Sequence, residues 1–443
     1  MDMPKTFIDL FAGIGGFHWA LKDLDYECVL AVEKDKAAQN IYKLNFPECA
    51  KKMVGDIRKL TRVKPRSPKT ERTADEIKKH LKNTYGIKAP IGFICGGFPC
   101  QPFSKSGKQR GSKDKTRGTL FGDIMLLADA LRPQYIILEN VRNLASDKHK
   151  PTIKTICDEL ERLGYEVNRK PIILSPNNLP SPYGQPQVRE RVFILARSSN
   201  TPKSRSPEMV LAHCMKVRAE NKNRPWDAKA ILLETNEAAA GYDIDHEEKW
   251  LKAWDEFTKI IPGKLPGHPI WTDVFGEKIE VKGMPKWKIN FIEKNQKFFD
   301  KNKNIILDWM EKYGVRTPAF PVSRRKFEWQ ASTVHPTQKG RTIQNLLIQL
   351  RPSGIRVKPP THLPALVAIN QTTIMGPMLL GRKDGKYRRI TPKEAAMLQG
   401  MHDVNFGDQS DGLSYKQLGN AVNVGVIKYL VERLTGVVPC ENQ

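Results

Sequence analysis

Short runs of apolar residues alternate with amphipathic stretches over the first 196 residues of the chain. The apolar runs predict strands, and the stretches with helical periodicity predict the helices between them. Predicted strands are 5–10, 28–32, 54–57, 91–95, 135–138, 167–174 and 192–196, and predicted helices are 18–24, 36–46, 121–131 and 151–163. This alternation favours an α/β fold with a mostly parallel, doubly wound sheet covered by helices on both faces.

The pattern changes after residue 196. Residues 197–387 have no strand–helix rhythm, are rich in Pro, Gly and Lys, and contain seven of the eight tryptophans. We expect a second, smaller and irregular domain whose core takes up most of these tryptophans, with base stacking as their alternative use. Residues 388–443 return to helices, because Thr391, Pro392 and Glu394 form a capping box. The predicted domains are therefore 1–196, 197–387 and 388–443, the last of which completes the first.

Charge adds a candidate partner. The 443 residues contain 73 Lys and Arg against 48 Asp and Glu, which gives a net charge of +25. Nearly all of the excess lies in 51–88, 103–118 and 316–387. A solvated basic surface explains one such stretch, but three together favour a polyanion, and nucleic acid above all.

Other features exclude classes of protein. No apolar run approaches 18 residues and the N-terminus resembles no signal peptide, so we expect a cytoplasmic protein without a membrane span. The seven cysteines are scattered, with no C-x-x-C pair and no His/Cys cluster at zinc spacing. The sequence therefore predicts a reducing compartment and no metal.

Cys100 is the candidate nucleophile. It lies in 96–104, Gly-Gly-Phe-Pro-Cys-Gln-Pro-Phe-Ser, directly after the predicted strand 91–95. The glycines end the strand, and Pro99 and Pro102 stiffen the turn. Catalytic groups collect beyond strand ends in open α/β sheets, whereas a buried core thiol is the alternative.

Two acidic residues and a glycine turn predict a nucleoside pocket. Gly13, Gly15 and Gly16 lie between the first strand and its helix, where backbone can approach a ligand. Glu33 and Asp56 each follow a later strand and are candidates for ribose and adenine contacts. For either acid alone, simple surface exposure is the alternative. The loop 105–118, rich in glycine and basic residues, suits phosphate contact.

Taken together, these residues resemble the DNA cytosine-5 methyltransferases of the bacterial type. The matching motifs occur in the family's order. They are Phe-x-Gly-x-Gly within 7–17, Pro99-Cys100-Gln101, Arg-Gly-Thr-Leu-Phe at 117–121, Glu139-Asn140-Val141, Gln-x-Arg-x-Arg at 187–191, 388–400 and 417–422. The resemblance covers 1–196 and 388–443, with 351–356 between them.

The resemblance implies a Rossmann-like, S-adenosyl-L-methionine-dependent methyltransferase fold. It implies that 1–196 and 388–443 form the catalytic domain and that 197–387 form a target-recognition domain for double-stranded DNA. It also implies a monomeric enzyme of prokaryotic or viral origin, associated with the nucleoid of a prokaryotic cell, that acts as the modification enzyme of a restriction–modification system. Sequence alone gives neither the recognition site nor the group that takes the carbon 5 proton.

The resemblance assigns roles to individual residues. The implied catalytic residues are Cys100, Glu139, Arg189 and Arg191, with one or both arginines directed at cytosine oxygen 2. The implied cofactor-binding residues are Phe11, Gly13, Gly15, Gly16, Phe17, Glu33, Asp56, Ile57, Pro99, Leu120, Asn420 and Ala421. The expected DNA-binding residues are Gln101, Ser104, Lys105, Lys108, Arg110, Arg324, Arg325, Arg351 and Arg356. One departure is Lys34, which stands where the family often has an aromatic residue that stacks on adenine.

Three other functions share part of this pattern. An RNA (tRNA) cytosine-5 methyltransferase on the same scaffold shares these motifs, but 191 residues between the flanking motifs favour duplex DNA. A catalytically inactive DNA-binding protein conflicts with the intact Cys100, Glu139, Arg189 and Arg191. A dehydrogenase is excluded because the glycine turn lacks G-x-G-x-x-G spacing.

Overall fold

A computed structural model describes residues 4–67, 70–99, 119–201, 204–222, 224–232, 239–366 and 373–437. The chain divides into two compact units. Unit 1 comprises Met1–Pro225, Ala365–Ile369 and Ala396–Gln443, and unit 2 comprises Trp226–Pro364 and Asn370–Ala395. Within the described residues, no helix combines the length and apolar character needed to cross a bilayer.

Unit 1 is built on an eight-stranded sheet in the order β3-β2-β1-β4-β5-β9-β6, with β7 also paired to β9. The strands are β1 (Thr6–Leu10), β2 (Glu27–Val32), β3 (Met53–Val54), β4 (Phe93–Gly97), β5 (Tyr135–Val141), β6 (Tyr165–Val167), β7 (Ile172–Leu174) and β9 (Arg191–Ser198). Strands β1 to β5 pair in parallel, and β9 runs antiparallel to β5, β6 and β7. The mostly parallel sheet is therefore confirmed. The single strand expected at 167–174 is wrong, because the chain forms β6 and β7 there.

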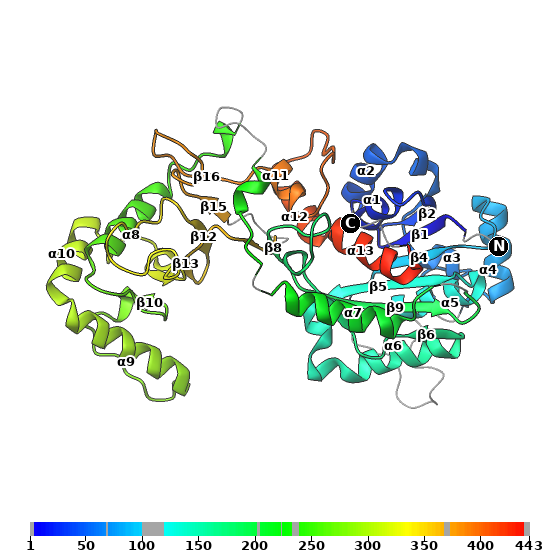
Figure 1. Ribbon diagram of the computed structural model, residues 1–443, viewed down its shortest axis with the longest axis horizontal. Helices are drawn as coiled ribbons and strands as arrows, with labels where there is room; N and C mark the ends of the chain where they lie inside the picture. The colour runs from blue at the N-terminus through cyan, green and yellow to red at the C-terminus, as the bar shows by residue number, and fades with distance from the viewer. Residues whose placement is uncertain are drawn as a thin grey trace. The chain divides into compact units, whose positions relative to one another are not determined.

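Helices cover both faces of this sheet, as Figure 1 shows for α1 and α2 on one side and α6 on the other. The doubly wound α/β fold is thereby confirmed. The helices are α1 (Gly16–Lys22), α2 (Lys36–Asn45), α3 (Arg58–Thr61), α4 (Ala74–Tyr85), α5 (Leu120–Leu131), α6 (Lys150–Arg162), α7 (Pro207–Glu220), α12 (Asp411–Asn420) and α13 (Val424–Thr435). Helix α7 packs on β7 and β9, so unit 1 continues beyond residue 196, and α13 packs on α1.

Sequence determines several helix ends directly. Asp35 caps α2, because its carboxylate accepts hydrogen bonds from the backbone of Ala37 and Ala38. Thr73 and Glu76 form a reciprocal capping box at the start of α4. The predicted box of Thr391 and Glu394 is present at α11 (Pro392–Met397).

The parallel register brings three strand ends to one edge of the sheet. Leu10 pairs with Gly96, and Gly96 in turn pairs with Leu138. The residues that follow, Phe11, Gly97 and Glu139, therefore emerge side by side. In open α/β sheets this edge binds ligands.

Unit 2 has a six-stranded sheet of its own, in the order β10-β11-β13-β12-β15-β16. Its strands are β10 (Ile270–Trp271), β11 (Lys326–Trp329), β12 (Leu347–Arg351), β13 (Gly354–Lys358), β15 (Thr373–Met375) and β16 (Arg388–Arg389), and its longer helices are α8 (Glu248–Ile260), α9 (Lys286–Lys301) and α10 (Lys303–Tyr313). This unit is more regular than expected, because strands of two to five residues are too short to show a period.

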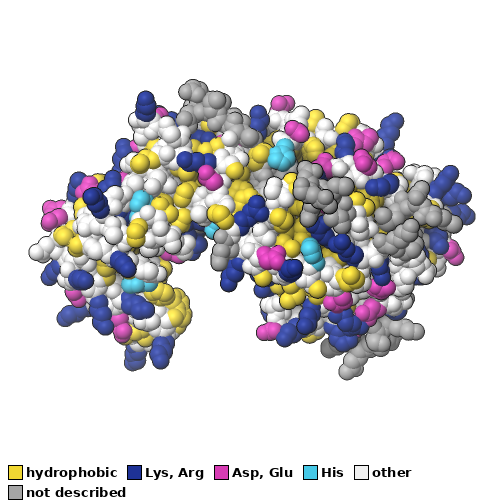
Figure 2. Space-filling model, viewed as in Figure 1, with side chains coloured by type: hydrophobic (Ala, Val, Ile, Leu, Met, Phe, Trp, Pro, Cys, Tyr) yellow, Lys and Arg dark blue, Asp and Glu magenta, His cyan; other side chains and the backbone are white. Residues whose placement is uncertain are grey.

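Aromatic side chains form much of the core of unit 2. Trp254 and Trp309 are almost completely buried, and Trp254 stacks on Phe327 with ring centroids 4.5 Å apart. Trp250 and Trp329 are also buried, whereas Trp287 is exposed. The expectation that most of these tryptophans build a core is therefore confirmed. Lys and Arg side chains are scattered over the visible face of both units (Figure 2).

Candidate active site

A cleft of about 430 Å³ opens at the edge of the sheet where β1, β4 and β5 end. The cleft is lined by seven residues that the sequence analysis assigned to the catalytic or cofactor site. They are Phe11, Gly13, Glu33, Pro99, Glu139, Arg191 and Asn420. The cleft is also lined by residues that were not predicted as site residues, among them Ile14, Asp35, Asn140, Leu413 and Lys416. Asn140 adjoins a nominated motif residue, whereas Leu413 and Lys416 lie on α12 and carried no signal.

The glycine turn after β1 forms one wall of the cleft. Gly13 and Gly15 have φ of +56° and +93°, which L side chains adopt only under strain. A Cβ on Gly15 would lie 2.4 Å from the Phe46 ring, and one on Gly16 would lie 2.6 Å from Val422 Cγ2. Gly13 thus faces the cleft, while Gly15 and Gly16 permit the close packing that positions it. Phe17 is buried next to them.

Glu33 closes the same wall through two backbone hydrogen bonds. Its Oε2 accepts from the N–H of Gly13 at 2.8 Å, and its Oε1 accepts from the N–H of Asp35 at 2.7 Å. Because a carboxylate has about four acceptor sites, Glu33 keeps lone pairs for donors in the cleft. A fixed acceptor beside a glycine cradle fits the ribose hydroxyls of a nucleoside.

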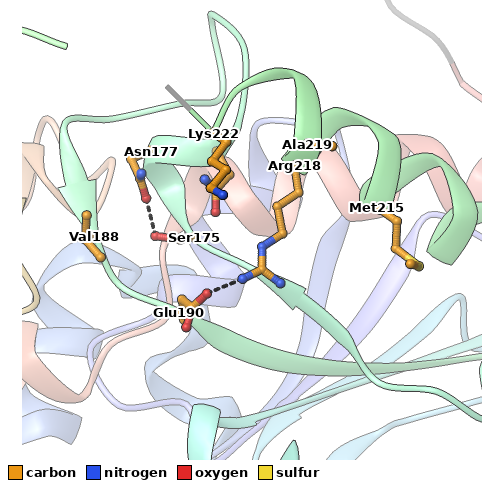
Figure 3. A pocket seen from close by; sticks show the side chains of 9 residues that line it. Ser175, Asn177, Val188, Glu190, Met215, Arg218, Ala219 and Lys222 are labelled. Carbon is orange, nitrogen blue, oxygen red and sulfur yellow. Dashed lines mark hydrogen bonds and ion pairs between the residues drawn. The ribbon is translucent and has the colours of Figure 1, made fainter. Parts of the chain in front are cut away.

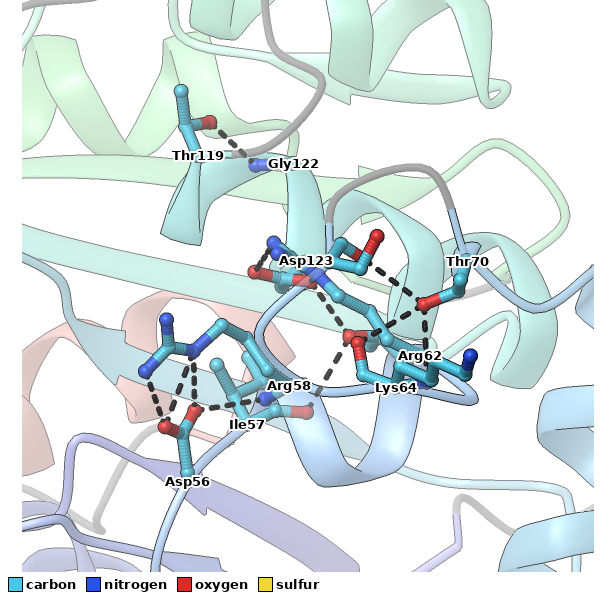
Figure 4. A network of polar contacts seen from close by, with 11 residues as sticks. Asp56, Ile57, Arg58, Arg62, Lys64, Thr70, Thr119, Gly122 and Asp123 are labelled. Atoms are coloured by element: carbon cyan, nitrogen blue, oxygen red, sulfur yellow. Dashed lines mark hydrogen bonds and ion pairs between the residues drawn. The ribbon is translucent and has the colours of Figure 1, made fainter.

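Asp56, Ile57 and Leu120 are not among the residues that line the cleft. The Asp56 carboxylate forms a forked ion pair with Arg58, whose Nε lies 2.9 Å from Oδ1 (Figure 4). The Arg58 guanidinium lowers the pKa of Asp56. Asp56 therefore has a partner within the protein, and its adenine contact stays a prediction.

A buried ion pair lies beside Asp56 in the same network. Arg62 donates from Nη2 to Asp123 Oδ2 at 2.7 Å, and both side chains are buried (Figure 4). Thr61 donates to Asp123 as well, at 2.6 Å. This network joins α3 to the first turn of α5, where Thr119 caps the helix.

Glu139 and Arg191 form the polar pair of the cleft. Arg191 Nε lies 3.0 Å from Glu139 Oε1, across the antiparallel strands β5 and β9. Burial raises the pKa of Glu139, against the opposing charges of Arg191 and Arg189. A carboxyl group whose protonated form is favoured can donate a hydrogen bond to a ring nitrogen.

Asn140 ties the end of β5 to the segment before Cys100. Its Nδ2 donates to the carbonyl of Phe98 at 2.8 Å, and its Oδ1 accepts from the N–H of Val141 at 2.9 Å. This bond anchors the chain at Phe98, two residues before Cys100 in the sequence. Several nominated residues lie outside the described residues: Cys100, Gln101, Ser104, Lys105, Lys108 and Arg110.

Arg189 and Arg191 have different environments. The i, i+2 spacing of Arg189 and Arg191 predicts that both lie on one face of a strand. This prediction is wrong, because strand β8 (Gln187–Val188) ends before Arg189 and β9 begins at Arg191. The Nη2 of Arg189 donates to the carbonyls of Gly419 and Ala421, each at 2.8 Å. Burial lowers the pKa of Arg189 to about 9. Arg189 therefore clamps the end of α12, and Arg191 is the member of the pair that lines the cleft.

The four nominated arginines of unit 2 have partners within that unit. Arg351 and Arg356 share Glu328, with nitrogen–oxygen distances of 2.8 and 2.9 Å. Arg324 donates to the Arg351 carbonyl at 3.2 Å, and Arg325 donates to the Phe320 carbonyl at 2.9 Å. Removing any of these four side chains therefore removes an interaction within unit 2.

A second cavity in unit 1, of about 480 Å³, lies between α7 and the segment 175–178 (Figure 3). Glu190 and Arg218 form an ion pair across it, and Ser175 donates to Asn177. Met215 and Val188 are exposed at its edges. Lys222 lines it as well, and none of the residues predicted to be catalytic is among its lining residues.

Comparisons with known proteins agree with this arrangement. The family model for C-5 cytosine-specific DNA methylase matches residues 5–436. The type II methyltransferase M.AluI of Cellulosimicrobium cellulans is 34% identical over 96% of this chain and 91% of its own length. M.BanI of Aneurinibacillus aneurinilyticus is 30% identical over 98% of this chain and 96% of its own length.

One solved structure supports the fold alone. DNMT2 from Spodoptera frugiperda aligns with a TM-score of 0.50 and 19% identity, covering 97% of this chain and 99% of that chain. The family match spans both units and nearly the whole chain, including every strand and helix that borders the cleft. The chain therefore belongs to the C-5 cytosine-specific DNA methylase family and is a DNA (cytosine-5-)-methyltransferase.

Proposed function

We propose that this enzyme methylates carbon 5 of one cytosine in a specific duplex DNA sequence, with S-adenosyl-L-methionine as methyl donor. We further propose that it is the modification enzyme of a restriction–modification system, as its full-length type II relatives suggest. One observation carries the proposal. A single cleft joins a nucleoside cradle, Gly13 and Glu33, to a polar pair suited to a pyrimidine edge, Glu139 and Arg191.

Cofactor binding is proposed for the glycine wall of the cleft. Phe11, Gly13 and Glu33 suit the adenosine half, because a bare backbone turn and a fixed carboxylate accept a flat ring and its ribose. Pro99 and Asn420 line the same space. When bound, S-adenosylmethionine supplies an electrophilic methyl group. Of the other residues predicted to bind the cofactor, Gly15, Gly16 and Phe17 shape this wall. The roles of Asp56, Ile57, Leu120 and Ala421 stay predictions.

Cys100 is proposed as the nucleophile. Its thiolate adds to carbon 6 of cytosine, and the electron pair of the 5,6 double bond then makes carbon 5 nucleophilic. Glu139, in its protonated form, donates to ring nitrogen 3 and stabilises the negative charge that develops there. Loss of the carbon 5 proton and departure of the Cys100 thiolate restore the double bond in the methylated product.

Arg191 is proposed to bind cytosine oxygen 2. It is already held beside Glu139, so one ion pair orients both groups towards the same base edge. Arg189 is proposed to act through position, because it fixes the end of α12 that carries Asn420. The target base cannot reach this cleft from within a stacked duplex, so it has to be flipped out.

Unit 2 is proposed as the target-recognition domain. It carries none of the proposed chemistry, and residues 316–387 are strongly basic. Base edges are read by side chains that donate and accept hydrogen bonds, whereas phosphates are held by charge. The loop residues Lys105, Lys108 and Arg110 are proposed to hold phosphates, together with Gln101 and Ser104 near the flipped base.

Methyl transfer from labelled S-adenosylmethionine to duplex DNA, compared with tRNA, tests the substrate class. We expect label in DNA, and bisulfite sequencing of DNA from cells expressing the enzyme should then show one methylated sequence. Label in tRNA alone would establish the RNA enzyme instead. Label in neither, with DNA binding retained, would establish a DNA-binding protein without activity.

Glu33→Gln tests the cofactor wall. Removing the charge weakens the acceptor that faces the ribose, so we expect the affinity for S-adenosylmethionine to fall by about 1.5–3 kcal/mol, or roughly 10- to 150-fold. Isothermal calorimetry measures it. Glu27→Gln is the matched control, since Glu27 is exposed at the start of β2, the strand that Glu33 follows, and pairs with half-buried Lys52. Equal affinities for S-adenosylmethionine in the wild type, Glu33→Gln and Glu27→Gln would show that the cofactor pocket lies elsewhere.

The division between units predicts two kinds of DNA-binding variant. Alanine substitutions at exposed polar positions of 316–387 should change which sequence is methylated, because base contacts select sequence. Lys105→Ala and Lys108→Ala should lower the rate on every sequence alike. Methylation of a random-sequence duplex pool followed by sequencing measures both effects. If only the Lys105→Ala and Lys108→Ala variants changed which DNA sequence is methylated, the loop and not 316–387 would be assigned to sequence recognition.

A further inference from the structure

Five polar side chains meet in the core of unit 1, apart from the cleft. They come from β1, α1, β2, α2 and the 3₁₀ turn η1 (Pro47–Lys52), and each is at most 2% exposed. They are Asp9, His18, Cys28, Tyr42 and Cys49. Polar groups this deeply buried are costly unless they are paired, so the cluster calls for a physical explanation.

Three of these residues are close enough to share one metal ion. A nitrogen of His18 and the sulfurs of Cys28 and Cys49 all lie within 4.8 Å of one another. The centre of a triangle with sides of 4.8 Å lies about 2.8 Å from each corner, against zinc bonds of about 2.3 Å to sulfur and 2.0 Å to nitrogen. Inward shifts of less than about 1 Å would therefore complete the bonds.

The surrounding groups favour a cation at this point. Among the described residues, Asp9 Oδ1 has no hydrogen-bond partner, although Asp9 is completely buried. Its Oδ2 accepts from the Tyr42 hydroxyl at 3.4 Å. That hydroxyl lies 2.8 Å from His18 Nδ1 and 3.6 Å from Cys28 Sγ. The Tyr42 hydroxyl thus connects a completely buried carboxyl group, one oxygen of which has no partner among the described residues, to the imidazole and to one of the thiols.

We propose that His18, Cys28 and Cys49 bind a structural Zn²⁺ ion, with Asp9 supplying the further negative charge of the site. Two thiolates and one neutral imidazole form a donor set that zinc prefers. Binding converts two thiols to thiolates and releases their two protons to solvent, and His18 coordinates through a ring lone pair.

The site would brace the glycine turn. His18 lies in the first turn of α1, two residues after Gly16, and its ring stacks on Phe46 with centroids 3.6 Å apart. Phe46 is also the ring that excludes a side chain at Gly15. An ion that fixes His18 therefore fixes the packing beneath Gly13 and Gly15. Sequence spacing missed the cluster, because residues 18, 28 and 49 lie on three different elements.

Cobalt substitution of the full-length protein tests the site. The reduced, chelator-treated enzyme is titrated with Co²⁺, and thiolate-to-cobalt charge-transfer absorption is recorded. We expect this band in the wild type, its displacement by Zn²⁺, and its loss in Cys28→Ser and Cys49→Ser. Cys157→Ser and Cys214→Ser are matched controls that should keep the band, since both thiols are equally buried in unit 1.

Metal content and stability give a second readout that requires no variant. The wild type should retain about one zinc per chain, and a chelator should lower its thermal unfolding midpoint by several degrees. A wild type without bound zinc and without a charge-transfer band would overturn the proposal. So would a band that survives in Cys28→Ser and Cys49→Ser, or a Cys28–Cys49 disulfide in protein kept under reducing agent.

Discussion

Cys100→Ala is expected to abolish methylation while leaving DNA binding intact. The thiolate is the only group proposed to form a bond to the base, so its loss removes covalent activation of carbon 5. A decrease on the order of 10⁴-fold or more is expected for such a nucleophile. The measurement is transfer of labelled methyl groups to duplex DNA, together with a gel-shift titration of binding.

A mechanism-based substrate sharpens this experiment. Duplex DNA with 5-fluorocytosine at the target should trap the wild-type enzyme covalently in the presence of cofactor, because fluorine cannot leave as a proton does. Peptide mapping should place the adduct on Cys100. Cys157→Ala, which removes a buried thiol from α6, should form the adduct as the wild type does. Methylation by Cys100→Ala, or an adduct on another residue, would remove Cys100 from the mechanism.

Arg189→Met is expected mainly to lower the stability of the protein, whereas Arg191→Met is expected mainly to slow methyl transfer. Arg189→Met leaves the carbonyls of Gly419 and Ala421 buried without their charged donor, so it should lower the free energy of unfolding by about 2–4 kcal/mol. Arg191→Met leaves a neighbouring carboxyl, Glu139, that can become neutral by taking up a proton. It should therefore lower stability by less than about 1 kcal/mol and slow methyl transfer by roughly 10²- to 10³-fold.

Urea unfolding and single-turnover methylation separate these effects. Arg189→Lys is a second control, because lysine keeps the charge but loses the fork that reaches two carbonyls. We expect it to recover part of the stability, and any active fraction should have a nearly normal rate per folded molecule. Equal stability in Arg189→Met and the wild type would show that the clamp contributes nothing. An unimpaired rate in Arg191→Met would show that Arg191 does not bind the base.

The sequence predicted the catalytic unit well where chemistry depends on parallel strand ends. Phe11, Gly13 and Glu33 follow strands and Glu139 lies near the end of β5, and parallel pairing brings such positions together whatever the details of packing. Arg189 was harder to predict. Its contacts lie about 230 residues away, and the interruption between β8 and β9 has no signature in the pattern of apolar residues.

Ion pairing also distinguishes two acidic residues for which the sequence predicted similar roles in cofactor binding. Glu33 and Asp56 both follow strands, but Arg58 lies two residues after Asp56 and neutralises it. Unit 2 could not be predicted in detail, since its strands are short and its sheet joins segments that lie far apart in the chain. The nearness of His18, Cys28 and Cys49 likewise follows from tertiary packing alone.

The contact of Gly16 with Val422 has a consequence for synthesis on the ribosome. The first helix of unit 1 packs on α13, which is the last described helix of the chain. Translation proceeds from the N-terminus, so the whole of unit 2 emerges before the partner of α1 exists. At about 5–20 residues per second the nascent chain waits for tens of seconds with this helix face uncovered. The glycine turn therefore gains its full packing only after α13, the last described helix, has left the exit tunnel, and a chain truncated before Val422 leaves Gly16 without this packing partner.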